Sequence, residues 1–104
     1  MTLKGTVTAF YWENPHCQIL LEVTDEKGKV VNWGIGTSPP SVLRRSGWTA
    51  QSLHPGDQIT ITFAPSKKGT PVGYVFGESS ADDHKIVLPN GEVLHSNRPS
   101  GGEN

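Results

Sequence analysis

Three features that often reveal a protein's function are scarce in this chain: cysteine, net charge and long apolar runs. A single cysteine in 104 residues excludes an internal disulfide. Nine lysines and arginines stand against ten acidic residues, so no strong field of one sign covers the surface and general nucleic-acid binding is disfavoured. No apolar run reaches the roughly 18 residues that a membrane-spanning helix needs.

Sequence signatures of catalysis and of metal binding are also missing. There is no Gly-x-Ser-x-Gly element, no phosphate-binding loop and no cysteine and histidine spacing typical of structural zinc. We therefore predict no cofactor and no dedicated metal site. The alternative is weak binding of a divalent or copper ion by histidines, for which the candidate group is His84, His95, Asp82 and Asp83.

The chain does contain short segments rich in β-branched and aromatic residues, separated by turns made from its 12 glycines and 8 prolines. Alternation of apolar and polar residues predicts five strands and a C-terminal hairpin about Asn90-Gly91. These segments are residues 3–12, 17–23, 30–36, 58–63 and 72–76, with the hairpin at 86–94. One short helix is predicted over residues 39–46, with Ser38 at its N-cap.

Three strands, a helix and two further strands is the order of the five-stranded Greek-key barrel called the OB-fold. We therefore predict an all-β, OB-fold-like barrel over residues 1–95, with the hairpin included and a disordered tail at 96–104. The alternative is an open β-sandwich of the immunoglobulin kind, which lacks a helix between its third and fourth strands.

Three local patterns refine this prediction. The apolar phase changes within residues 3–12, which predicts a β-bulge in the first strand. In the second strand Cys17 and the alternate residues up to Val23 form the predicted core face, and His16 and Gln18 fall on the other face. In the fourth strand the same alternation predicts that Ile59, Ile61 and Phe63 point inward. In the third strand Gly34 and Gly36 leave that second face bare, so that a flat ligand or another backbone can approach closely.

The segment Trp12-Glu13-Asn14-Pro15-His16 is predicted to form the corner between the first two strands. An indole, an amide and an imidazole converge there, and such groups bind ligands or do chemistry. The predicted ligand-binding residues are Trp12, Asn14, His16, Gln18 and Asn32. The structural alternative makes Asn14 a turn-forming residue and His16 a hydrogen-bond donor to backbone. We expect Trp33 and Trp48 to be core residues.

Four motifs follow one another along the chain: Trp12-x-Asn14-Pro15-His16, Asn32-Trp33, Arg45-x-Gly47-Trp48-Thr49-x-x-Ser52-Leu53-x-Pro55-Gly56-Asp57 and Leu88-Pro89-Asn90-Gly91. With these motifs in this order the chain resembles a family of small bacterial proteins of uncharacterised function, most of which are exported through a cleaved leader. The chain lacks the His-His-Ser-like segment of that family and has Gly36 where members often carry an acidic residue. The resemblance implies a periplasmic or secreted protein whose leader is absent from this sequence, with a cytoplasmic location as the alternative.

Together these observations favour a small binding or accessory module that recognises a small polar or aromatic ligand, or a protein partner, through the corner and the face of the second and third strands. The rival is a small acid/base enzyme of the isomerase or lyase type, in which His16 is the candidate catalytic residue. A homodimer is expected if the strand at 72–76 or the final hairpin leaves an apolar edge uncovered. A membrane partner is not predicted.

Overall fold

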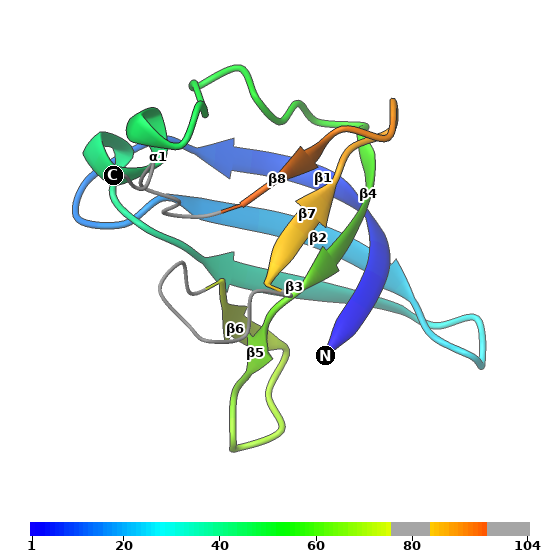
Figure 1. Cartoon of the computed structure of the whole chain (residues 1–104). Helices are drawn as coiled ribbons and strands as arrows, with labels where there is room; N and C mark the ends of the chain where they lie inside the picture. The colour runs from blue at the N-terminus through cyan, green and yellow to red at the C-terminus, as the bar shows by residue number, and fades with distance from the viewer. Residues whose placement is uncertain (76–83, 96–104) are drawn as a thin grey trace.

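The computed structural model describes residues 1–75 and 84–95 and consists mostly of β-strands (Figure 1). In the described residues eight strands and one short helix follow one another as β1 (Thr2–Tyr11), β2 (Gln18–Thr24), β3 (Val30–Gly36), α1 (Pro40–Arg45), β4 (Gln58–Thr62), β5 (Ala64–Pro65), β6 (Val72–Tyr74), β7 (Lys85–Val87) and β8 (Val93–Leu94). That helix is too short to cross a membrane, and the described part of the chain holds no other candidate.

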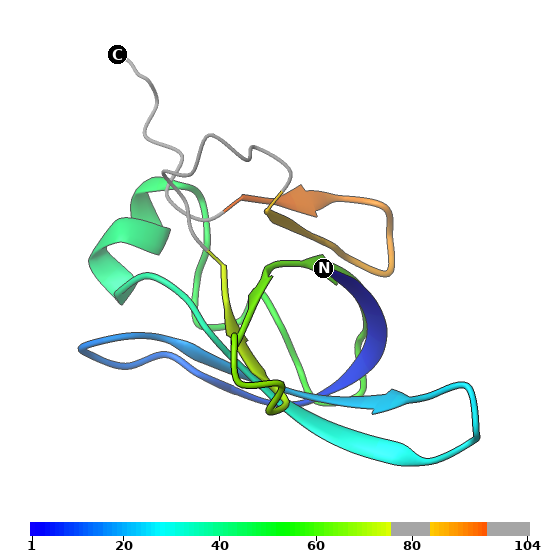
Figure 2. The same cartoon turned by 90° about the horizontal axis from the view of Figure 1, so that it is seen from below.

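All eight strands belong to one sheet, in the order β5-β6-β3-β2-β1-β4-β7-β8. Among the described strands β3 and β6 form a parallel pair, and the other neighbours are antiparallel. Phe63 alone separates β4 from β5, although β5 lies at the far end of the strand order. The sheet must therefore curl back on itself, and it forms the half-barrel seen from below in Figure 2.

β1 is the strand around which the sheet bends. Its first half pairs with β4 and its second half pairs with β2, and the register shifts between Val7 and Ala9. This irregularity confirms the bulge predicted from the phase change. Gly5 allows the close approach of β2, because a Cβ at this position would lie 2.6 Å from the carbonyl oxygen of Glu22.

The concave side of the sheet holds the core. The predicted core face of β2 is confirmed, since its residues from Cys17 to Val23 in alternation are buried, and so is the inward face of β4. The buried apolar residues are Val7, Cys17, Ile19, Leu21, Val23, Ile35, Leu43, Trp48, Leu53, Ile59, Ile61, Phe63, Val75 and Ile86. Residues on the opposite, outer face of β2 are therefore the ones available to a partner.

α1 packs against the core of the half-barrel through Leu43. It buries Leu43 and is followed by Trp48, which is 1% exposed and whose indole Nε1 donates to the carbonyl oxygen of His95 at 2.9 Å. The prediction that Trp48 is a core residue is thus confirmed. The predicted cap is wrong: Pro39, not Ser38, is the N-cap residue, and no side chain caps the helix. Pro40 occupies the first turn, where a missing N–H costs nothing.

The count of five strands is not confirmed, because the described residues form eight. The predicted fourth strand continues past Phe63 into β5, and the predicted C-terminal hairpin, which is confirmed as β7 and β8, joins the sheet through β4. β6 is paired on both sides, by β5 and by β3, so the described residues of the strand at 72–76 do not meet the condition under which that strand would form a homodimer. Phe76 and the predicted tail at 96–104 lie outside the described residues.

Candidate functional site

The corner between β1 and β2 is a short exposed loop with a cis peptide bond between Asn14 and Pro15. It ends at Cys17, which is buried and whose backbone is tied to the segment before α1. The Cys17 N–H donates to the carbonyl oxygen of Ser38 at 3.2 Å, and the Thr37 N–H donates to the carbonyl oxygen of Cys17 at 3.0 Å. These two hydrogen bonds hold the backbone of Cys17 and so position His16, the residue before it.

Trp12 lies on the helix side of the corner. Its ring packs edge-on against Phe10, with 6.0 Å between the ring centroids, and the guanidinium carbon of Arg44 lies 5.7 Å from its ring centroid. It is partly buried against the core. Trp12 therefore joins α1 to the end of β1 rather than facing outward with the rest of the corner.

Four side chains gather on the outer face at the other side of the corner, and we call Tyr11, His16, Gln18 and Tyr74 the outer-face patch. Tyr11 lies opposite Gln18, Gln18 opposite Gly36, and Gly36 opposite Tyr74, so these residues form one row across four strands. The His16 ring meets the Tyr74 ring edge-on, with centroids 5.8 Å apart. Tyr11 is 46% exposed, and His16 and Gln18 are also exposed.

Gly36 is covered in the structure, which corrects the expectation that both glycines of β3 leave a bare surface. A Cβ at Gly36 would lie 2.9 Å from two carbons of the Tyr74 ring, so the ring fills the space that a side chain would take. The Tyr74 hydroxyl donates to the carbonyl oxygen of Thr37 at 3.0 Å. The glycine thus admits a tyrosine from β6, and that tyrosine supplies the patch with an aromatic ring.

The predicted ligand-binding residues do not all come together. His16 and Gln18 share the patch, and Asn14 stands exposed beside them in the corner. Asn32 pairs with Glu22, four residues further along β2 than Gln18, which places it about 14 Å away at about 3.4 Å per residue. The structure therefore brings together part of the predicted set and separates Trp12 and Asn32 from it.

Sequence reasoning missed both tyrosines of the patch. Tyr11 could have been found, because it directly precedes Trp12 and must face the other side of the strand. Tyr74 could not, because its position depends on the parallel pairing of β6 with β3, which joins segments almost 40 residues apart in the chain.

Burial keeps the Cys17 thiol behind the patch and the Tyr74 phenol within it uncharged. It raises the pKa of the Cys17 thiol above its usual 9.0; a hydrogen bond with the Glu13 backbone acts in the opposite direction, and the Glu13 charge adds to the rise. Burial likewise raises the pKa of the Tyr74 phenol above 10.0, with a smaller contribution from Cys17. Both groups are neutral near pH 7, so the patch presents hydrogen-bonding and aromatic groups and not a thiolate nucleophile.

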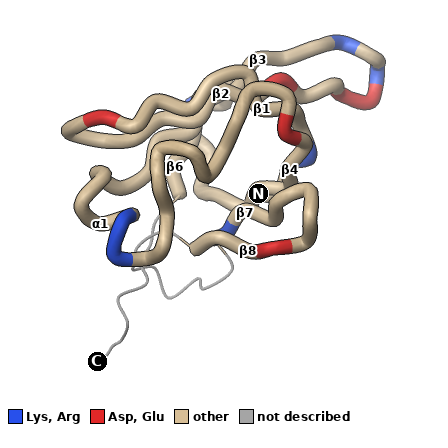
Figure 3. The backbone as a smooth tube through the Cα atoms, turned by 90° about the horizontal axis from the view of Figure 1, so that it is seen from above, with Lys and Arg blue, Asp and Glu red and all other residues tan. Residues whose placement is uncertain are grey.

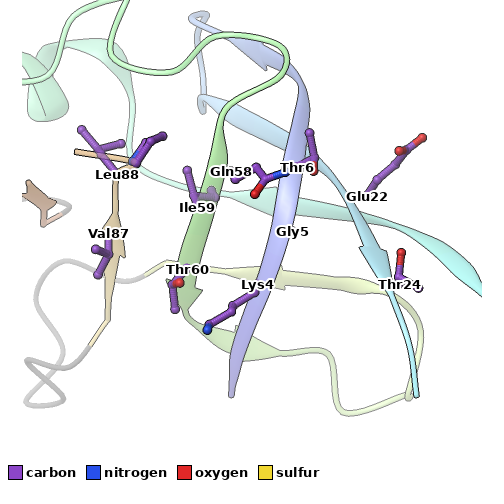
Figure 4. Close-up of a pocket in the computed structure, with 11 residues that line it drawn as sticks. Lys4, Gly5, Thr6, Glu22, Thr24, Gln58, Ile59, Thr60, Val87 and Leu88 are labelled. Atoms are coloured by element: carbon purple, nitrogen blue, oxygen red, sulfur yellow. The ribbon is translucent and has the colours of Figure 1, made fainter. Parts of the chain in front are cut away.

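Two hollows in the protein surface lie away from the patch. One, of about 450 Å³, is on the outer face of β1, β2, β4 and β7 (Figure 4), and its lining residues are Lys4, Gly5, Thr6, Glu22, Thr24, Gln58, Ile59, Thr60, Val87, Leu88 and Pro89. The other, of about 430 Å³, lies across the β7–β8 turn, and residues from that turn line both. None of the four patch residues lines either hollow.

Charged residues do not concentrate at the patch. Figure 3 shows basic and acidic residues spread over separate loops and strands, with Arg44 and Arg45 together at the end of α1. In residues 1–75 and 84–95 no group of three histidine, cysteine or acidic side chains could hold a metal ion. The alternative metal group cannot be placed, because Asp82 and Asp83 lie outside those ranges.

Fold and site together define a small domain with one curled β-sheet and an open patch of aromatic, imidazole and amide groups. The chain belongs to a family of unknown function, DUF6152, whose model matches residues 1–75. The match extends from β1 to the residue after Tyr74, so it includes the whole patch. No curated protein and no solved structure matches the chain.

Proposed function

We propose that this protein is an exported binding or accessory module that recognises a partner protein through the outer-face patch. The single observation that carries this proposal is the convergence of Tyr11, His16, Gln18 and Tyr74 on an exposed face. Tyrosines are enriched at protein interfaces because they combine a large apolar ring with a polar tip. The periplasmic or secreted location rests on the resemblance of the sequence motifs.

A partner protein suits this surface better than a small ligand does. Small molecules bind in concave pockets that bury most of their surface. Tyr11, His16 and Gln18 are all exposed, so a small molecule bound among them would stay largely in water. A protein surface can supply the missing walls. The small polar or aromatic ligand is therefore the second choice at this site.

We also propose that the domain is a variant of the OB-fold. Two features support this relation. The helix stands between β3 and β4, as in an OB-fold. The parallel β3–β6 pair closes a five-stranded barrel if β4 and β5 are counted as one strand beside β1, β2, β3 and β6. In this description the hairpin of β7 and β8 is an addition to the edge of β4. The outer face of β2 and β3, where the patch lies, is where OB-folds bind ligands.

The acid/base enzyme alternative requires His16 to meet a second titratable group in an enclosed site. The aromatic contact of His16 is with Tyr74, whose hydroxyl is committed to the carbonyl oxygen of Thr37. The exposure of His16 outside both hollows supports recognition over proton transfer. Catalysis would instead be favoured if His16→Ala abolished turnover of a substrate while leaving its binding intact.

A photo-crosslinking experiment tests the proposal. A photoreactive phenylalanine analogue is placed at Tyr11 and, as a control, at Lys68 on the exposed β5–β6 hairpin, and the protein is irradiated in its native cells. We expect one discrete crosslinked product from position 11 and none from position 68. The product should disappear when His16 and Gln18 are both replaced by alanine. Equal products from both positions, or a product indifferent to that double substitution, would rule out the patch as the binding surface.

The hollow shown in Figure 4, on the outer face of β1, β2, β4 and β7, supports a second function. Lys4 extends toward β4 while Glu22 points to the opposite side, and neither forms an ion pair within the described residues. Hydroxyl and amide side chains from Thr6, Gln58 and Thr60 line the space between and beside these charges. We propose a small zwitterionic or polyhydroxylated ligand here. Amino acids and sugars should shift the NMR signals of these residues, and Lys4→Met should abolish the shifts; unchanged spectra would contradict this function.

A further inference from the structure

β3 is paired along its whole length on one side and along only half its length on the other. β2 covers it from Val30 to Gly36, whereas β6 begins opposite Gly34. Residues Val30–Asn32 therefore form an open sheet edge. Figure 2 shows this part of β3 at the rim of the sheet, where the β2–β3 hairpin projects past the other strands.

The direction of the backbone groups on this edge follows from the pairing. The Gly34 N–H donates to the carbonyl oxygen of Pro71 at 3.0 Å, and the Gly36 carbonyl accepts from the Val75 N–H at 2.9 Å. Both residues thus face β6. Because backbone groups alternate with a period of two, Val30 and Asn32 direct their N–H and C=O groups to the same side. There, no described residue pairs with them.

Pro71 explains why the pairing stops. In a parallel ladder continuing past Gly34, the next donor to β3 would be the N–H of Pro71, aimed at the Asn32 carbonyl. Proline has no N–H, so the ladder ends there. Two residues before Pro71 the chain has already turned away from β3, since Gly69 adopts a positive φ of 79° and its N–H donates to the carbonyl oxygen of Ser66. The open edge is therefore built into the local sequence.

We propose that the open edge at Val30–Asn32 binds an extended peptide segment of a partner protein by strand addition. An added strand satisfies the free N–H and C=O groups of Val30 and Asn32. Its side chains on the concave side lie beside Val31 and Trp33, which are half-buried and apolar, so that side of the peptide is apolar. On the outer side it lies beside Val30, which is 53% exposed. This surface is separate from the outer-face patch, and the inference does not depend on the proposed function.

A second copy of this chain fits the edge less well than a partner peptide. If β3 paired with itself antiparallel about Val31, its residues preceding Val30 would lie opposite Trp33 and Gly34 of the other copy. That space is occupied by Pro71 and Val72. A self-pair is therefore limited to Val30–Asn32 of each copy, because β3 begins directly after the turn that Asp25 and Lys29 close, and about three residues a side is far less contact than a stable dimer needs.

The test uses random heptapeptides displayed on phage, selected against the whole protein and then synthesised for affinity measurement. Proline at position 32 removes the outward N–H without removing any bond to β2, and proline is tolerated in strands at such edge positions. We expect selected peptides to bind Asn32→Pro at least about tenfold more weakly than the unaltered protein, a difference of about 1.4 kcal/mol. Asn32→Ala is the matched control and should bind within about twofold, because the contact is made by backbone.

Two further measurements keep the outcome decisive if a proline variant fails to fold. Peptides N-methylated at the amide that faces β3 should lose binding to the unaltered protein, because the methyl group removes the donor and blocks approach. Bound peptide should also slow hydrogen exchange at the amides of Val30 and Asn32. The inference is overturned if no peptide is selected, if N-methylation has no effect, or if Asn32→Pro binds as well as Asn32→Ala.

Discussion

Replacing Gly36 with alanine should displace the Tyr74 ring and thereby destabilise both the sheet and the outer-face patch. The new Cβ would lie 2.9 Å from two ring carbons, closer than carbon atoms can pack. The ring cannot move aside without cost, because its hydroxyl donates to the Thr37 carbonyl and the ring contacts His16. Gly34→Ala is the matched control, since a Cβ there would find its nearest atoms at 3.9 Å.

The size of the effect follows from three contributions. Forcing a methyl group into a packed site costs about 1–3 kcal/mol. Losing the hydrogen bond of Tyr74 adds about 1 kcal/mol to this cost. Replacing a glycine within a strand stabilises the folded state by roughly 0.5–1 kcal/mol and so offsets part of it. We therefore expect Gly36→Ala to lower the free energy of unfolding by about 1–3 kcal/mol, and Gly34→Ala to leave it unchanged or raise it by roughly 0.5 kcal/mol.

Urea denaturation followed by tryptophan fluorescence measures this difference. A double-mutant cycle shows whether the loss of stability comes from the Tyr74 ring. In a Tyr74→Ala background the ring is absent, so Gly36→Ala should lower the free energy of unfolding by less than about 0.5 kcal/mol. If Gly36→Ala is as stable as Gly34→Ala, or if its cost persists without the tyrosine, then Tyr74 does not lie over Gly36 and the patch is not assembled as described.

Two other predictions concern the corner and the groups behind it. Arg44→Ala should lower the free energy of unfolding by about 0.5–1 kcal/mol through loss of the contact with Trp12, whereas Arg45→Ala should be neutral in the same urea assay. Because burial raises the pKa of Cys17 and Tyr74, the folded state retains their protons at pH values where the unfolded chain loses them. Stability should therefore be full below about pH 9 and fall as the pH rises further, and Tyr74→Phe should make that fall shallower; an unchanged slope would contradict the assigned shift.

Local patterns were sufficient for much of the fold. Period-two alternation identified the inward faces of β2 and β4, and the phase change in β1 located its bulge, because a half-buried strand must place every second residue in the core. The Asn90-Gly91 pair located the final hairpin for the same local reason. The strand count was not predictable in this way, since breaks as short as Phe63 between β4 and β5 depend on the curl of the sheet.

The site was predicted only where neighbours in sequence are also neighbours in space. His16 and Gln18 are two residues apart on one strand face, and the structure keeps them together. Trp12 was assigned to the same surface, but the contacts of its ring with Phe10 and Arg44 place it against the helix. Tyr74 joins the patch through the parallel pairing of β6 with β3, and no local sequence pattern encodes the register of that pairing.

The most direct test of the central claim is a nuclear Overhauser experiment on the aromatic protons of Tyr74. If β6 lies parallel to β3 as described, these protons should show strong cross-peaks to the Gly36 α-protons and to the His16 ring. Cross-peaks from Tyr74 to neither residue would mean that the aromatic, imidazole and amide groups do not share one surface, and the proposed partner-binding patch would not exist.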